Sequence, residues 1–153
     1  KIDISTGDII TPREIKYNFN LMLENRTIEV WAYNLETVLA EKLETVISRN
    51  VTNTRMRDFY DIYILQKLHG KQLKKQVLWN ALVATARKRG TLEQINSGDR
   101  REIFDEIEIS SVMENLWKTY QKNYSYAADI SWHAIVKSIC ALYGSILENM
   151  YDT

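Results

Sequence analysis

A lysine stands in the middle of an apolar helical stripe, a position where its charge needs a partner. Six apolar side chains share one face of a predicted helix over residues 35–49, spaced for about 100° per residue: Leu35, Val38, Leu39, Leu43, Val46 and Ile47. Lys42 lies near the centre of this face, whereas Glu36, Glu44 and Arg49 are predicted on the solvent side. An unpaired ammonium among leucines is costly, so Lys42 should contact a carboxylate, a ligand or water.

The next predicted helix offers carboxylates to this lysine. Arg55, Asp58 and Asp61 follow one another at intervals of three, and both aspartates border the apolar stripe of their helix. Two interpretations stay open. Lys42 and the aspartates, with Arg55 or Arg57, form ion pairs that lock two helices together, or the same groups form a site. Buried ion pairs often contribute little net stability, which favours the site.

A third carboxylate, Asp3, lies far away in the sequence on a predicted strand, opposite its apolar neighbours. A strand aspartate with a helical lysine and aspartates is a suitable set for phosphoryl chemistry. Carboxylate oxygens bind Mg²⁺, and a lysine neutralises the charge that develops on phosphate.

Composition excludes several classes of protein. One cysteine and two histidines leave neither an internal disulfide framework nor a zinc cluster. No apolar run approaches the roughly 18 residues of a membrane span, and no signal-like start is present, which indicates the cytoplasm.

The formal net charge is zero, but residues 62–92 contain no Asp or Glu. Four basic residues of this stretch, here called the basic patch, are Lys74, Lys75, Arg87 and Lys88. They form either solvated helix faces or a surface for nucleic-acid phosphates.

The chain is predicted to be an α+β protein, with a small antiparallel or mixed sheet followed by a mainly helical body. Strands are expected within residues 1–33, at 2–5, 17–21 and 28–32. Helices are expected at 35–49, 55–68, 72–89, 101–108, 111–123 and 131–150, with a loop over 91–100. Asn34 is the predicted N-cap of the first helix.

Three blocks of sequence, KIDISTGDIITP, AYNLETVLAEKLETVISR and TRMRDFYDIYIL, resemble the AbiEii/AbiGii toxin family of nucleotidyltransferases from bacterial abortive-infection systems. The resemblance covers residues 1–90, and residues 91–153 correspond to a variable helical tail. It implies that Lys42 contacts nucleotide phosphates and that Asp58 and Asp61 are the aspartates of the last motif. Arg55 and Arg57 are then the preceding basic residues, and Asp3 is the third carboxylate and a metal ligand.

The resemblance also implies an architecture and an activity. Residues 1–33 would complete a polymerase-β-like nucleotidyltransferase core, and residues 34–153 would form a helical domain. The enzyme would transfer a nucleoside monophosphate from an Mg²⁺-bound nucleoside triphosphate to an RNA acceptor, with tRNA the leading candidate, or to a protein. The basic patch would hold the acceptor. A winged-helix antitoxin encoded nearby and a role in phage defence in the bacterial cytoplasm are implied as well.

The family's first motif, a glycine-rich turn followed by Asp-x-Asp, has no match in this sequence. The expectation is therefore the C-terminal portion of such a toxin, inactive by itself. The alternative is a non-catalytic helical interaction module in which Lys42, Asp58 and Asp61 form structural ion pairs.

Overall fold

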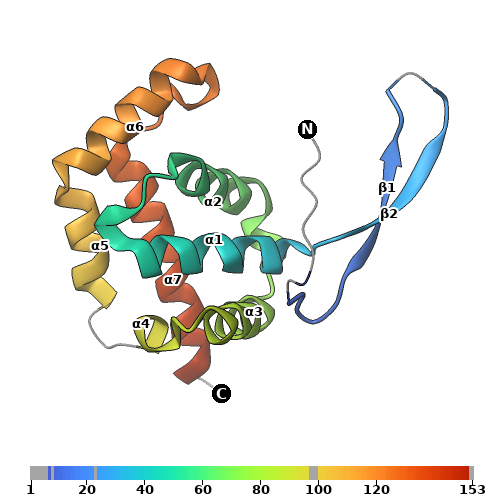
Figure 1. Cartoon of the computed structure of the whole chain (residues 1–153), viewed down its shortest axis with the longest axis horizontal. Helices are drawn as coiled ribbons and strands as arrows, with labels where there is room; N and C mark the ends of the chain where they lie inside the picture. The colour runs from blue at the N-terminus through green and yellow to red at the C-terminus, as the bar shows by residue number, and fades with distance from the viewer. Residues whose placement is uncertain (1–6, 8, 23, 97–99, 152–153) are drawn as a thin grey trace.

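In the part of the chain that the structure describes, a two-stranded antiparallel sheet is joined to a body of seven helices (Figure 1). The structure is a computed structural model that describes residues 7, 9–22, 24–96 and 100–151. Strand β1 (Ile15–Asn20) pairs with β2 (Thr27–Ala32), with Tyr17 opposite Val30. The predicted α+β class and the strands expected at 17–21 and 28–32 are confirmed. The strand expected at 2–5, with Asp3, lies outside the described residues.

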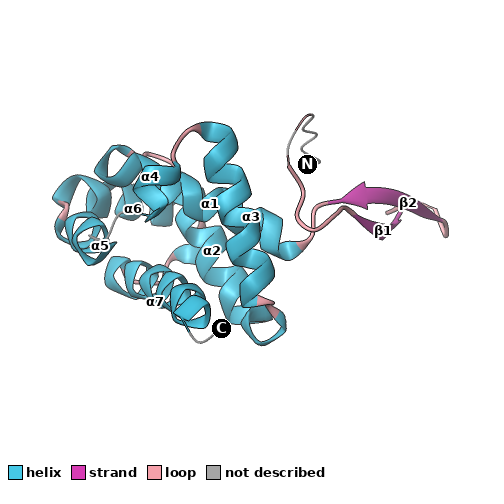
Figure 2. Ribbon diagram, turned by 90° about the horizontal axis from the view of Figure 1, so that it is seen from below, coloured by secondary structure: helices cyan, strands magenta, loops and turns pink. Residues whose placement is uncertain are grey.

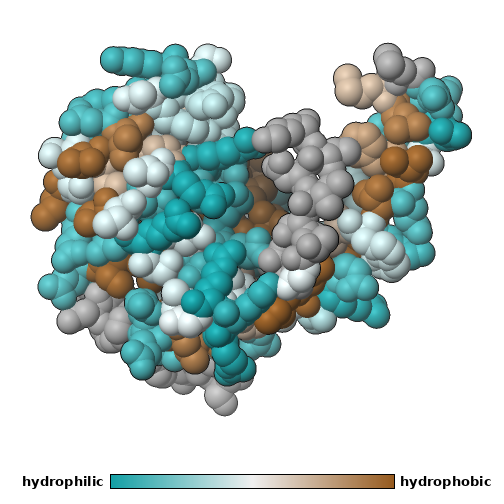
Figure 3. Space-filling model, in the orientation of Figure 1, coloured by the Kyte–Doolittle hydropathy of each residue, from teal (hydrophilic) through white to brown (hydrophobic). Residues whose placement is uncertain are grey.

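The hairpin projects away from the helices (Figures 1 and 2). Alternation along the strands and the register place six apolar residues on one of its faces: Ile15, Tyr17, Phe19, Ile28, Val30 and Ala32. All of them except Ala32 are exposed, and Figure 3 shows apolar side chains gathered along this arm. The hairpin therefore contributes little to the core that holds the helices.

The helices are α1 (Leu35–Arg49), α2 (Met56–His69), α3 (Lys75–Arg89), α4 (Leu92–Asn96), α5 (Arg100–Ile109), α6 (Ser111–Asn123) and α7 (Trp132–Tyr151). The expected helices are confirmed, but the third begins at Lys75 because a 3₁₀ turn, η2, occupies Gly70–Gln72. The prediction of a loop over 91–100 is wrong in part, since α4 occupies the first half of this range. Ile95 is fully buried, and this burial stabilises a helix too short for its periodicity to be recognised.

One core unites all seven helices, with α1 near its centre. α1 packs against α2 and α3, and α7 crosses α2, α3 and α5 (Figure 2). The segment after residue 90 therefore packs directly on the helices that carry the motifs. Among the described residues, no helix has the length and apolar character that a membrane crossing requires.

The central place of α1 corrects one prediction about its faces. Besides its apolar stripe, Thr37, Glu44 and Thr45 are buried. Glu44 was expected in solvent, yet only 2% of its surface is exposed. A helix with neighbours on both sides has almost no solvent face, so a simple division into two faces places Glu44 wrongly.

Asn34 fastens the chain that precedes α1 to the helix start. Its Oδ1 accepts a hydrogen bond from the Thr37 backbone N at 2.8 Å, which confirms the predicted N-cap. Its Nδ2 donates to the backbone oxygens of Thr11 at 2.6 Å and Arg13 at 3.2 Å. One buried side chain thus satisfies the helix terminus and anchors the segment leading into the hairpin.

We expect Asn34→Ala to lower the free energy of unfolding by about 1–2 kcal/mol, because the cap and both anchoring bonds are lost. Urea denaturation followed by circular dichroism measures the change. Asn115→Ala, at an exposed position of α6, is the control and should change stability by less than about 0.5 kcal/mol. Equal stability of the two variants would contradict the anchoring role.

Candidate functional site

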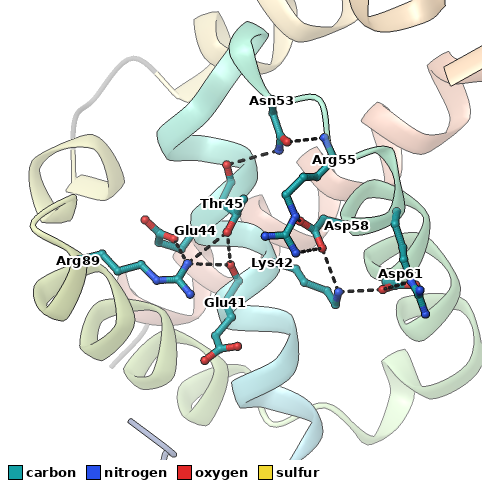
Figure 4. Close-up of polar contacts among 10 residues, drawn as sticks. Glu41, Lys42, Glu44, Thr45, Asn53, Arg55, Asp58, Asp61 and Arg89 are labelled. Carbon is teal, nitrogen blue, oxygen red and sulfur yellow. Dashed lines mark hydrogen bonds and ion pairs between the residues drawn. The ribbon is translucent and has the colours of Figure 1, made fainter. Parts of the chain in front are cut away.

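Lys42 lies between two carboxylates of the neighbouring helix (Figure 4). Its Nζ is 3.0 Å from Asp58 Oδ1 and 2.7 Å from Asp61 Oδ2. The aspartates are nearly one turn apart on α2, so both reach the same ammonium group across the α1–α2 contact. The pairing predicted from the sequence is confirmed.

Two arginines complete the cluster from the outside. Arg55 precedes α2 and places its Nε 2.9 Å from Asp58 Oδ2, while Arg57 Nε is 3.8 Å from Asp61 Oδ2. Both guanidinium side chains are exposed, at 58% and 74%. The arginines are thus anchored at one end and accessible to a ligand at the other.

Asn53 fixes the turn that brings Arg55 into place. Its Oδ1 accepts a hydrogen bond from the Arg55 backbone N at 2.9 Å, and its Nδ2 donates to the Thr45 backbone oxygen at 3.5 Å. Asn53 is fully buried, and its two hydrogen bonds join the start of α2 to α1. The sequence offered no signal for this role, because the residue lies in a polar link.

The charge balance of the cluster favours an anion. Lys42, Arg55 and Arg57 oppose only Asp58 and Asp61, which leaves one positive charge in excess. The Asp58 side chain is 3% exposed, and Lys42 and Asp61 are exposed to similar extents, 20% and 23%, so the two arginines are the groups of the cluster nearest to solvent. A phosphate would meet the arginines before it met a carboxylate.

The described residues do not suit a resident Mg²⁺ ion. Asp58 and Asp61 are both already in contact with cations. Within the described ranges, no three side chains of His, Cys, Asp or Glu gather as possible metal ligands. The predicted ligand Asp3 lies outside those ranges, so the expectation of a metal ion remains a prediction.

A second ionic contact holds the other side of α1. Arg89 Nη1 pairs with Glu44 Oε2, and Thr91 Oγ1 donates a hydrogen bond of 2.7 Å to Glu44 Oε1 (Figure 4 shows Glu44 and Arg89). Arg89 also donates to Thr45 Oγ1 at 3.2 Å. This contact attaches the end of α3 to α1. Sequence reasoning missed it because the partners are far apart in the chain.

The four residues of the basic patch do not form one compact surface. Lys74 and Lys75 lie at the start of α3, and Arg87 and Lys88 lie in its last turn. From the helical rise per residue, Lys75 and Arg87 are about 18 Å apart along the axis. All four are exposed, and Lys88 Nζ donates to the Gly7 backbone oxygen. A ligand that touches both groups must be an extended one.

The fold is α+β, and a lysine-centred cluster with one positive charge in excess lies between two of its helices. The family model described as "Nucleotidyl transferase AbiEii toxin, Type IV TA system" matches residues 1–138, and the chain belongs to this family. The match continues well past residue 90, into the segment expected to be a variable tail. The searches of curated proteins and of solved structures found no match. Membership in a type IV toxin–antitoxin family implies an antitoxin partner.

The Lys42–Asp58 contact is expected to be energetically coupled. A double-mutant cycle with Lys42→Met and Asp58→Asn should give a coupling of about 1–3 kcal/mol, because Asp58 is buried. Urea denaturation of the four proteins measures this energy.

The control is the exposed pair Glu114–Lys118, whose separation of 2.7 Å is close to the 3.0 Å of Lys42–Asp58. Its coupling should stay below about 0.5 kcal/mol, because both side chains are solvated. If the two cycles gave equal couplings, burial would not strengthen the cluster.

Proposed function

We propose that the Lys42 cluster binds the phosphates of a nucleoside triphosphate and that the toxin transfers a nucleoside monophosphate to an RNA acceptor. A tRNA-like molecule is the leading acceptor, and the bacterial cytoplasm, where both substrates occur, is the place of action. The observation that carries the proposal is the ammonium of Lys42, fixed at 3.0 and 2.7 Å from two aspartates within a net cationic cluster. Membership in a nucleotidyltransferase toxin family supports the reaction class.

Each residue of the cluster has a role in this proposal. Lys42 contacts phosphate oxygens, and Asp58 and Asp61 hold its ammonium group in position before the ligand arrives. Such preorganisation favours charge that develops during phosphoryl transfer, because the protein need not rearrange. Arg55 and Arg57 supply planar donors suited to phosphate, and the 3.8 Å contact of Arg57 leaves it the more loosely held.

The proposed metal requirement rests on other residues. Nucleotidyl transfer with an Mg²⁺-bound donor needs carboxylates to hold the ion, and Asp58 and Asp61 are engaged with cations. Asp3 stays the proposed ligand. In this proposal the Lys42 cluster binds phosphate, and Asp3 binds the metal ion.

We expect Lys42→Met to fold and to bind phosphates at least about 10-fold more weakly, since a charge-assisted contact is lost. Isothermal titration calorimetry with inorganic tripolyphosphate and with ATP measures binding. In an active toxin preparation, transfer of labelled nucleotide should fall by roughly 10²–10³. The control is Lys137→Met, at an exposed position of α7. Tripolyphosphate binding by folded Lys42→Met equal to that of the unsubstituted chain would sink the assignment.

Separate charge reversals test whether the basic patch holds an extended RNA. Lys74→Glu with Lys75→Glu, and Arg87→Glu with Lys88→Glu, should each weaken tRNA binding and reduce its salt dependence. Fluorescence anisotropy at several salt concentrations measures both effects. Salt-independent binding by the unsubstituted chain, or no change in either double variant, would show that RNA does not use this helix.

The alternative function, a non-catalytic interaction module, has one observation in its favour. Both carboxylates that face Lys42 already neutralise it, as structural ion pairs would. In that case Lys42→Met should strongly destabilise the fold, and the unsubstituted chain should bind neither ATP nor tripolyphosphate. The calorimetry and a urea denaturation curve together decide between the two functions.

A further inference from the structure

Four tyrosine rings gather where α2, α6 and the 3₁₀ turn η3 (Ser125–Ala127) meet. Tyr60 of α2 lies 4.7 Å from Tyr126, and Tyr120 lies 4.6 Å from Tyr124, measured between ring centroids. The Tyr124 and Tyr126 centroids are 5.4 Å apart. The four rings, here called the tyrosine cluster, therefore form one continuous aromatic group.

The inner and outer members of this cluster differ in burial. Tyr120 is 9% exposed and packs on the buried Trp117, whereas Tyr124 and Tyr126 are 45% and 53% exposed. The hydroxyl groups of Tyr120 and Tyr126 are hydrogen-bonded at 2.9 Å. An inner ring and a hydroxyl contact thus position two outer rings that keep much of their surface in solvent.

The tyrosine cluster adjoins the Lys42 cluster along α2. Arg57 is followed by Tyr60 at i+3 and by Asp61 at i+4, so all three are neighbours on the helix surface. Burial raises the pKa of Tyr120. The hydrogen bond to Tyr126 and the charge of Asp61 raise this pKa further, and the charge of Arg57 lowers it. Burial, Tyr126 and Asp61 likewise raise the pKa of Tyr60. These phenols remain neutral at physiological pH and do not repel phosphates.

We propose that Tyr124 and Tyr126, supported by Tyr60 and Tyr120, form a stacking surface for unpaired bases of a single-stranded RNA. The phosphates of the same strand then lie against Arg57. Exposed aromatic rings beside a cationic group are the combination that single-stranded nucleic acids use, with bases on rings and phosphates on cations. The inference rests on the proposed function and deepens it, because it identifies where the acceptor is held beside the phosphate site.

Two features favour an RNA strand over a single nucleotide. Two rings are exposed side by side, which gives room for more than one base. Arg57, the most exposed cation of the Lys42 cluster, also lies one helical turn from Tyr60, so a strand can pass from the rings toward the cluster. A donor triphosphate on Lys42 and an acceptor strand on the tyrosines would then approach each other across Arg57.

The test compares two double variants of the full 153-residue chain. Tyr124→Ala with Tyr126→Ala removes the rings, and Tyr124→Phe with Tyr126→Phe keeps them. Both lose the Tyr126 hydroxyl and its bond to Tyr120, so they differ only in the aromatic surface. Anisotropy of a fluorescein-labelled single-stranded RNA octamer measures binding, and circular dichroism confirms folding. Tyr17→Ala is the control, because this hairpin tyrosine has a similar exposure of 54%.

We expect the alanine pair to bind the octamer at least about 10-fold more weakly, and the phenylalanine pair to stay within about 3-fold of the unsubstituted chain. An abasic octamer should bind the unsubstituted chain and the alanine pair equally. Unchanged octamer binding by the folded alanine pair overturns the inference, as does an equal loss in the phenylalanine pair. If the alanine pair does not fold, Tyr124→Ala and Tyr124→Phe decide by the same comparison.

Tripolyphosphate separates this inference from the proposed function. It carries no base, so its binding should be lowered by Lys42→Met and unaffected by the alanine pair. Failure of the chain to bind tripolyphosphate overturns the phosphate site, whereas failure of the alanine pair to lose octamer binding overturns the stacking surface.

Discussion

The arrangement of the candidate site depends on one buried charge contact, the ammonium of Lys42 between Asp58 and Asp61. Removing a lysine and an aspartate from water is unfavourable. The attraction between the charges at 3.0 and 2.7 Å offsets this desolvation cost. This contact joins α2 to α1 beside their shared apolar core. The same two carboxylates also contact Arg55 and Arg57, and Arg57 adjoins the tyrosine cluster on the surface of α2. Under the proposed function, stability and phosphate binding share the same charges.

The central position of α1 explains why polar residues surround it. Its two flanks carry separate ionic contacts, Lys42 toward α2 and Glu44 toward α3. Apolar packing of ridges into grooves already restricts how neighbouring helices lie, and each charge pair adds a directional contact to it. The helices that carry the family motifs are therefore held at defined positions on both sides of one central helix.

The sequence predicted those features that depend on neighbours along the chain. Asn34 was recognisable as an N-cap, and Lys42 was conspicuous because a charge interrupted a regular apolar pattern. Glu44, Asn53 and α4 were not recognised or were placed wrongly, because their environments come from segments that approach only in the folded protein. The tyrosine cluster was missed for the same reason. The ring centroids of Tyr60 and Tyr126 are 4.7 Å apart, although the two residues are distant in the sequence.

The two ionic contacts of α1 close loops of different length, with consequences for the order of folding. Lys42 and Asp58 are separated by 16 positions, and Glu44 and Arg89 by 45. Short loops close with a smaller loss of chain entropy, and local contacts form faster than distant ones. The helical hairpin of α1 and α2 can therefore assemble early and serve as the template on which α3 and α7 condense. A nascent chain would then possess the Lys42 cluster before the rest of its core is complete.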